Sequence, residues 1–158
     1  MAQQLTHVDS RGAARMVDVS AKSVTVREAT ATGRVRTSAQ VVALLRDDGL
    51  PKGDALAVAR IAAIMAAKHT PDLIPLCHPI ALHAVDVDCT VVDDAVDVVV
   101  TTRTADRTGV EMEALTAVAV ACLAVVDMVK AVDPAATITD ICVLEKTGGK
   151  TGRWTRSS

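Results

Sequence analysis

The chain has 158 residues, the length of a single domain, and half of its residues are hydrophobic while 23% are charged. This balance excludes intrinsic disorder over most of the chain, because disordered segments combine low hydrophobicity with high net charge. The net charge is −2, and a single Trp is the only aromatic residue. A general nucleic-acid binder is therefore disfavoured, because such proteins are usually basic and often stack bases on aromatic rings.

Membrane insertion and secretion are not expected either. No uncharged apolar stretch reaches about 18 residues, the length of a spanning helix, and residues 1–18 contain no apolar signal sequence. The cysteines form no CxxC pair, and their spacing fits neither a zinc site nor a small disulfide scaffold. We expect a cytoplasmic protein without a metal site, and four thiols that are mostly buried: Cys77, Cys89, Cys122 and Cys142.

The first third of the chain predicts short elements. Residues 1–14 are polar and rich in small side chains, which predicts a mobile lead-in. Apolar and polar residues alternate over 16–19 and 23–27, which predicts two short strands, and Gly33 is expected to break this pattern. A short helix is predicted over 38–46, with the serine at its start as the N-cap.

The middle of the chain predicts a helix followed by an apolar loop. Asp54 suits an N-cap, because its carboxylate can accept hydrogen bonds from free backbone N–H groups, and the pattern after it predicts a helix over 55–68. Pro71 cannot continue that helix. Two further prolines within residues 72–79 predict an extended, rigid loop, and the apolar composition of this loop predicts that it is buried.

The second half of the chain predicts a hairpin, a long helix and a last strand. Alternating segments on both sides of Asp93-Asp94 predict the hairpin, and an apolar run that stops at Asp133-Pro134 predicts the helix. The two hairpin strands, the helix and the last strand are expected, in that order, over 85–92, 96–103, 110–132 and 137–146. A Gly-rich, basic tail over 147–158 completes the chain.

When the short helix is left out, the predicted order is strand, helix, strand, strand, helix, strand. This is the order of an α+β, ferredoxin-like fold, in which an antiparallel sheet carries two long helices on one face. We therefore expect one ferredoxin-like domain over residues 15–146, between the lead-in and the tail.

The two long helices also predict an oligomer. Residues 114–126 carry no charge, and Arg60 is the only charge within 55–67. A helix on the surface of a globular protein has a polar face, and one small sheet cannot cover both sides of two apolar helices. A homo-oligomer would supply the missing cover. The alternative is that residues 1–50 fold over the helices.

Lys146-Thr-Gly-Gly-Lys-Thr-Gly152 has the look of a phosphate-binding P-loop. The P-loop pattern requires a glycine where this chain has Leu144, and no helix can follow in the few residues that remain. Successive glycines can still form a backbone nest for an anion, assisted by the positive charges of Lys146, Lys150 and Arg153. We expect this segment to become ordered over the phosphates of a bound ligand; the alternative is a flexible tail.

Two polar side chains outside the long helix are candidates for a site. His78 lies in the proline-rich loop, which would hold an acid, a base or a ligand still, although a histidine in such a loop is often only structural. Lys52 lies in the turn before a helix, where it would contact phosphate, act in catalysis, or simply be solvated.

Each end of the long helix carries a further candidate pair. Glu111 and Glu113 open the helix, either as carboxylates favoured by its dipole or as hydrogen-bonding groups for a base or sugar. Asp127 and Lys130 share a face near its end. Burial would raise the pKa of the aspartate and lower that of the lysine, which favours proton transfer; the alternative is an ordinary ion pair.

Several segments taken together resemble the MoaC family over a range from about Leu5 to Gly152. The two most specific are Asp72-Leu-Ile-Pro-Leu-Cys-His-Pro79 and Thr108-Gly-Val-Glu-Met-Glu-Ala-Leu-Thr116. Others contribute to the resemblance: Met16-Val-Asp-Val-Ser-Ala-Lys22, Thr25-Val-Arg-Glu-Ala29, Lys52-Gly-Asp54, Ala59-Arg-Ile-Ala62, Asp127-Met128, Lys130-Ala-Val132 and the segment 146–152.

This resemblance implies an enzyme of molybdenum cofactor biosynthesis. MoaC-like proteins are lyases that convert 3′,8-cyclo-7,8-dihydroguanosine 5′-triphosphate to cyclic pyranopterin monophosphate and release pyrophosphate. They are ferredoxin-like and assemble as hexamers, a trimer of dimers, with active sites at subunit interfaces. No resident cofactor is implied, although Mg²⁺ could accompany the triphosphate, and neither a nucleic acid nor a membrane is an expected partner.

The resemblance also implies roles for individual residues. Asp127 matches the active-site aspartate of the family, and Lys52 and Lys130 match lysines assigned to proton transfer. His78 and the segment 146–152 are expected to contact phosphates. Substrate-binding positions are implied for two matched segments and for further pocket residues: Leu76, Cys77, His78, Met112, Glu113, Glu111, Arg27 and Lys146.

Two other functions stay open at this level. A non-catalytic oligomeric binding module would keep the apolar helices but would not need Lys52, Asp127 and Lys130 together. A nucleotide hydrolase is suggested by the Gly-Gly-Lys-Thr sequence, although Leu144 and the missing helix disfavour it.

Overall fold

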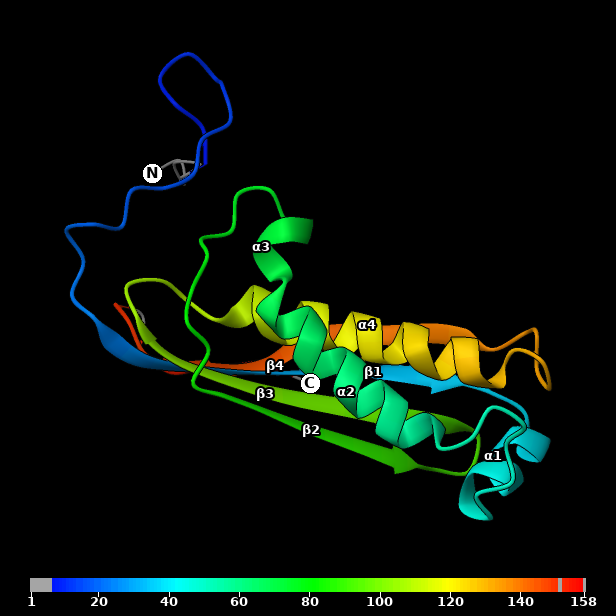
Figure 1. Cartoon of the computed structure of the whole chain (residues 1–158). Helices are drawn as coiled ribbons and strands as arrows, with labels where there is room; N and C mark the ends of the chain where they lie inside the picture. The colour runs from blue at the N-terminus through cyan, green and yellow to red at the C-terminus, as the bar shows by residue number, and fades with distance from the viewer. Residues whose placement is uncertain (1–6, 151, 158) are drawn as a thin grey trace.

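The computed structural model of the chain describes residues 7–150 and 152–157, and its centre is an antiparallel sheet (Figure 1). The strands lie in the order β2-β3-β1-β4-β5. Their bounds are Thr25–Arg36 for β1, Ala84–Val91 for β2, Ala95–Asp106 for β3, Thr137–Thr147 for β4 and Trp154–Thr155 for β5. Each neighbouring pair is antiparallel, so the fold is a mixed α/β fold with a five-stranded antiparallel sheet.

Two long helices, α2 (Ala55–Lys68) and α4 (Glu111–Val129), lie side by side on one face of this sheet (Figure 1). Short helices α1 (Ala39–Arg46) and α3 (Thr70–Leu73) connect the elements. The predicted N-caps are confirmed: the side chain of Ser38 accepts a hydrogen bond from the Val41 N–H, and that of Asp54 accepts one from the Ala57 N–H. The predicted hairpin and the long helix are also present, within a few residues of their expected ends.

Gly33 does not break the first strand, contrary to expectation. It lies inside β1, opposite Val98 of β3, and faces α4. A Cβ atom at this position would lie 2.6 Å from Cγ1 of Val118 and 3.2 Å from Sγ of Cys122. The glycine therefore allows close packing of helix on sheet at a point where any side chain would collide.

The expected strand over residues 16–19 is absent, and β1 begins only at Thr25. The reason is that the alternation there is too short to form a ladder, and the segment finds a different partner. Its backbone is held by a side chain, since Nε2 of His78 lies 2.6 Å from the carbonyl oxygen of Val17. Residues 1–6 of the predicted lead-in lie outside the described residues, and within 7–14 an isolated bridge joins Val8 and Ala14.

The loop over 72–79 is not buried in the chain, which corrects a second expectation. Its first residues complete the short helix α3, and Leu73 is 57% exposed. Pro75 and Pro79 are exposed, and the residues between them are half-buried. The apolar side chains of this loop line a cavity and the outer surface instead of filling the core.

The basic tail is also more ordered than expected, since Trp154–Thr155 forms the edge strand β5 on β4. Arg153 pairs with Glu145 at 2.7 Å, and Nε of Arg156 donates to the carbonyl oxygen of Val143 at 2.7 Å. These contacts offset the charge repulsion within the segment. Thr151, part of the expected phosphate-binding segment, lies outside the described residues.

By length and composition alone, α4 is apolar enough to cross a membrane, a feature that a search for uncharged stretches does not detect. In this fold 56% of its most apolar window is buried, which is typical of a core helix. All four cysteines are free thiols; Cys89 and Cys122 are buried, whereas Cys77 and Cys142 are half-buried.

Candidate functional site

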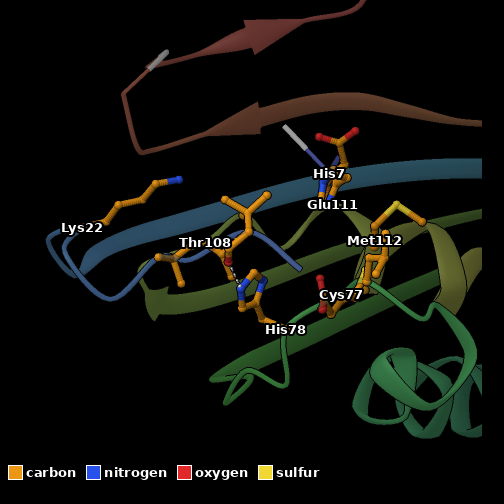
Figure 2. A pocket seen from close by; sticks show the side chains of 12 residues that line it. His7, Lys22, Cys77, His78, Thr108, Glu111 and Met112 are labelled. Atoms are coloured by element: carbon orange, nitrogen blue, oxygen red, sulfur yellow. Dashed lines mark hydrogen bonds between the residues drawn. The ribbon is translucent and has the colours of Figure 1, made fainter. Parts of the chain in front are cut away.

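A cavity of about 390 Å³ opens at the N-terminal end of α4 (Figure 2). One wall comes from the proline-flanked loop, which contributes Leu76, Cys77 and His78. The opposite wall comes from the turn before α4 and its first residues. The remaining lining residues belong to the N-terminal segment, so that the full set is His7, Val17, Val19, Lys22, Leu76, Cys77, His78, Thr108, Gly109, Glu111, Met112 and Glu113.

Glu113 is the buried carboxyl group of this cavity, with 3% of its surface exposed. Burial raises its pKa, because a low-dielectric environment disfavours the charged form. Burial, followed by the nearby Glu113 carboxylate, also raises the pKa of the Cys77 thiol. The cavity therefore contains two groups that keep their protons more readily than in water.

A smaller cavity of about 120 Å³ adjoins the first and shares Gly109 and Glu111 with it. Here Nζ of Lys146 lies 2.6 Å from Oε2 of Glu111. Arg27 lines the same cavity, and its Nε donates to the carbonyl oxygen of Asp106 at 3.2 Å. Two cations thus stand next to the main cavity, where an anionic ligand could be neutralised.

The glycines of the expected phosphate nest lie against Arg27. Gly148 and Gly149 have φ angles of 93° and 73°, in the left-handed region that glycine adopts without strain. A Cβ atom on Gly149 would collide with the Arg27 guanidinium, and one on Gly148 would collide with the backbone of Val26. The double glycine is therefore required for the chain to pass close to this arginine.

Asp127 forms a second cluster at the other end of α4. Nζ of Lys130 donates to Oδ1 of Asp127 at 2.6 Å, and Nζ of Lys52 donates to the Asp127 carbonyl oxygen at 2.8 Å and lies 3.3 Å from Oδ2. All three side chains are exposed in the chain, by 40–58%. The hydrogen bonds from Lys130 and Lys52 lower the pKa of Asp127. The expectation of a raised pKa is therefore wrong, because the group is not buried here.

The predicted residues thus form two groups, one at each end of α4. Met112 lies near the start of α4 and Asp127 near its end, so a rise of about 1.5 Å per residue separates them by roughly 22 Å. The structure brings together the predicted residues around the main cavity and, separately, Asp127 with its two lysines. Within one chain it does not bring these two groups into contact.

Several lining residues were missed by reasoning from the sequence: Thr108 and Gly109 in the turn before α4, and four residues of the N-terminal segment. Lys22 and His7 line the main cavity (Figure 2), together with two apolar residues of the same segment, Val17 and Val19. Alternation over 16–19 predicts a strand and gives no sign of a cavity wall. The sequence offered one indication, since Lys22 lies in a segment that resembles the family. That resemblance alone gives Lys22 no role in the site.

Among residues 7–150 and 152–157, no three His, Cys, Asp or Glu side chains lie close enough together to hold a metal ion. The carboxyl groups that line the main cavity are Glu111 and Glu113. Glu111 is engaged with Lys146, and Glu113 is buried.

Comparison with known proteins shows the family to which the whole chain is similar. The model of the MoaC family matches residues 16–149. A cyclic pyranopterin monophosphate synthase from Streptomyces coelicolor is 67% identical over 98% of this chain and 91% of its own length. Proteins of the same name from Nocardioides sp. and Parvibaculum lavamentivorans are 66% and 58% identical, covering 98% and 96% of this chain and 96% of the relative in both cases. The chain therefore belongs to the MoaC family.

Proposed function

We propose that this protein is a cyclic pyranopterin monophosphate synthase, a lyase that acts in the cytoplasm. Its substrate is 3′,8-cyclo-7,8-dihydroguanosine 5′-triphosphate, and its products are cyclic pyranopterin monophosphate and pyrophosphate. The observation that carries the proposal is the hydrogen-bonded cluster of Asp127 with Lys52 and Lys130, which are the residues implied for catalysis. A binding module would not need these three side chains to meet from two distant parts of the chain.

The fold of this enzyme is, in our proposal, ferredoxin-like. The strand order β2-β3-β1-β4 and the two helices on one face of the sheet support this assignment. The edge strand β5 and the short helices α1 and α3 are additions to that arrangement.

The working unit is a homo-oligomer, a hexamer built from dimers. Support comes from an exposed apolar stripe on α2, where Val58, Ile61 and Met65 are 44%, 60% and 57% exposed, and from Leu123 of α4, which is 57% exposed. The residues on α2 are three and four positions apart, so they share one helix face. Residues 7–50, where the structure describes them, leave these side chains uncovered.

The active site is composite, formed by two subunits. In one chain the cavity and the Asp127 cluster are roughly 22 Å apart, too far to act on one small substrate. A dimer that places the Asp127 cluster of one protomer against the cavity of its partner would unite the two groups. The same contact would desolvate Asp127 and its lysines, which are exposed in the isolated chain.

The Asp127 cluster and the residues around the cavity then have different chemical roles. The guanine-derived ring must open and close again as a pterin, and each bond change needs a positioned proton donor or acceptor. Lys52 and Lys130 serve as these groups, oriented by Asp127. The phosphates meet His78, Arg27 and Lys146, whose charge or N–H groups stabilise the leaving pyrophosphate.

Mg²⁺ enters this proposal only as a companion of the triphosphate. Proteins usually hold Mg²⁺ by one or two carboxylates together with substrate phosphates. Glu111 is paired with Lys146, and burial raises the pKa of Glu113, so these two carboxyl groups do not form a ready Mg²⁺ site in the chain. When bound, Mg²⁺ would supply charge neutralisation to the pyrophosphate. The chain's own part would be to orient the phosphates through Arg27 and Lys146.

The test of the proposed function is incubation of the purified protein with the cyclic dihydroguanosine triphosphate. We expect cyclic pyranopterin monophosphate and one pyrophosphate per substrate. A binding module would release no pyrophosphate, and a nucleotide hydrolase would release phosphate or pyrophosphate without forming the pterin. Either of those results would overturn the proposal.

A further inference from the structure

Trp154 is the only tryptophan of the chain, and it lies directly opposite Lys146 in the β4–β5 ladder. Directly opposed residues of antiparallel strands place their side chains next to each other. Nζ of Lys146 lies 5.6 Å from the centre of the Trp154 ring. This is within the range of a cation–π contact, in which the electron-rich face of the ring attracts the ammonium group.

The strand β5, which carries the ring, is anchored to β4 by contacts that do not involve the Lys146 side chain. Next to Trp154, Arg153 pairs with Glu145. Two positions further along, the backbone N–H of Arg156 donates to the Leu144 carbonyl oxygen at 2.8 Å, and its Nε donates to the Val143 carbonyl oxygen. The Arg156 guanidinium also lies 5.8 Å from the ring centre. The backbone of Trp154 is therefore anchored, and its ring offers an aromatic face against which the Lys146 side chain can rest.

Lys146 connects this support to the site. Its ammonium pairs with Glu111 at 2.6 Å, and the two side chains line the smaller cavity together with Arg27. Glu111 also lines the main cavity. The ammonium group is thus bounded by a carboxylate on one side and an aromatic ring on another, which fixes its position better than a single ion pair with an exposed carboxylate would.

We propose that Trp154 is a positioning residue, which holds the Lys146 ammonium where it meets the phosphates of the substrate. This inference rests on the proposed function. In this proposal β5 is part of the substrate-binding site. The contact with the Lys146 ammonium group depends on the aromatic face of Trp154 and not on its apolar volume alone.

The first test compares two substitutions of similar bulk. Trp154→Phe keeps an aromatic face, whereas Trp154→Leu keeps apolar volume without one. A cation–π contact at an exposed site corresponds to a change of about two- to five-fold. We expect Trp154→Leu to raise KM for the cyclic dihydroguanosine triphosphate by about three- to five-fold with kcat nearly unchanged, and Trp154→Phe to restore most of this loss. Equal KM values for the two variants would overturn the proposal.

The second test does not depend on turnover. Because the chain has one tryptophan, its fluorescence reports on this ring alone. We expect Lys146→Gln to change the emission of the free, full-length protein, and Lys68→Gln, at the end of α2, to leave it unchanged. Pyrophosphate should alter the emission of the wild type in a saturable way and have a smaller effect on Lys146→Gln.

An emission spectrum that is identical in wild type and Lys146→Gln would contradict the contact, whether or not the protein makes the pterin. A wild type that forms no product, but whose emission depends on Lys146, would contradict the proposed function while supporting the placement of the ring. The two failures are therefore distinguishable. The Lys146→Gln variant retains the tryptophan ring. The fluorescence test therefore still decides whether Lys146 contacts Trp154 if the Trp154→Leu variant does not fold.

Discussion

At the scale of single residues, the chemistry depends on the environment of Asp127. Its carboxylate accepts from Lys130 and lies close to Lys52, a residue far away in the sequence, and these hydrogen bonds lower its pKa. The carboxylate is therefore ionised at neutral pH, in a position to orient two ammonium groups. An ordinary ion pair on one helix would have involved Lys130 alone.

We predict that Asp127→Ala and Lys130→Ala each reduce kcat strongly, by about 10²- to 10⁴-fold, the usual effect of losing a general acid or base. Steady-state assays with the cyclic dihydroguanosine triphosphate measure the loss. Light scattering should show an unchanged assembly, because the proposed interface rests on the exposed apolar stripe of α2 and not on these two polar side chains. Normal turnover in either variant would mean that the cluster is only an ion pair.

The role of a single residue could be predicted from the sequence where that role depends only on neighbours along the chain. Ser38 and Asp54 were predictable as caps because a cap requires only local geometry. The pKa of Asp127 was not predictable, because its direction depends on exposure and on Lys52, which arrives through tertiary structure. The role of Lys22 in the cavity wall depends on tertiary structure in the same way.

At the scale of elements, the position of α4 on the sheet is set by small residues. Ala114, Ala117 and Ala121 are fully buried on the helix, and Gly33 leaves room on β1 beneath Val118. Alternation and helical periodicity predicted the long strands and helices, but they also predicted a strand over 16–19 that is absent, and they missed α3 and β5. They could not predict that Gly33 continues a strand, because the reason is a helix far away in sequence.

We predict that Gly33→Ala destabilises the fold by about 1–3 kcal/mol, the usual cost of overpacking a core. The added methyl group would lie 2.6 Å from Cγ1 of Val118, so helix and sheet must move apart. Urea unfolding at a fixed protein concentration measures the change. The double variant Gly33→Ala with Val118→Ala should recover part of the loss; a single variant as stable as wild type would disprove the steric argument.

Asp133 links the end of α4 to the start of α1 and gives a prediction that depends on pH. Its carboxylate accepts from the Thr37 hydroxyl and the Ser38 N–H, both at 2.8 Å, and these hydrogen bonds lower its pKa from the ordinary value of 3.8. A lowered pKa in the folded state means stabilisation that is present above the unfolded pKa and is lost as pH falls through the folded pKa.

Asp133→Asn should therefore lower the melting temperature at pH 7. The difference from wild type should shrink as the pH falls below about 4, since the wild-type carboxyl group then becomes neutral as well. Thermal unfolding followed by circular dichroism across this pH range measures both curves. A difference that stays constant with pH would show that the carboxylate charge contributes nothing.

At the scale of the whole molecule, the exposed stripe of Val58, Ile61 and Met65 agrees with what the sequence predicted from an apolar helix. Composition shows that a helix lacks a polar face, but it cannot show which face remains open after the sheet is covered. The structure shows which face remains open, because Ala55, Ala59 and the alanines in line with them are buried against the rest of the fold.

We predict that the native mass is a multiple of 16.4 kDa, most simply six chains. Ile61→Glu, which places a charge in the stripe, should reduce this mass, because an interface core does not accommodate an unpaired charge. Multi-angle light scattering on both proteins provides the measurement, and Arg60→Glu, beside the stripe, serves as a matched control. A wild type that runs as a monomer would contradict the interface.

The composite site is tested most directly by subunit complementation. Asp127→Ala and His78→Ala chains, each inactive alone, are co-expressed and purified as mixed assemblies. If each site takes Asp127 from one protomer and His78 from its partner, a mixed dimer regains one intact site, so activity should return to about a quarter of wild type. Mixing Asp127→Ala with Lys130→Ala, which alter the same half of the site, should restore none. No recovery in the first mixture, with mixed assemblies present, would place the whole site within one chain and contradict the account.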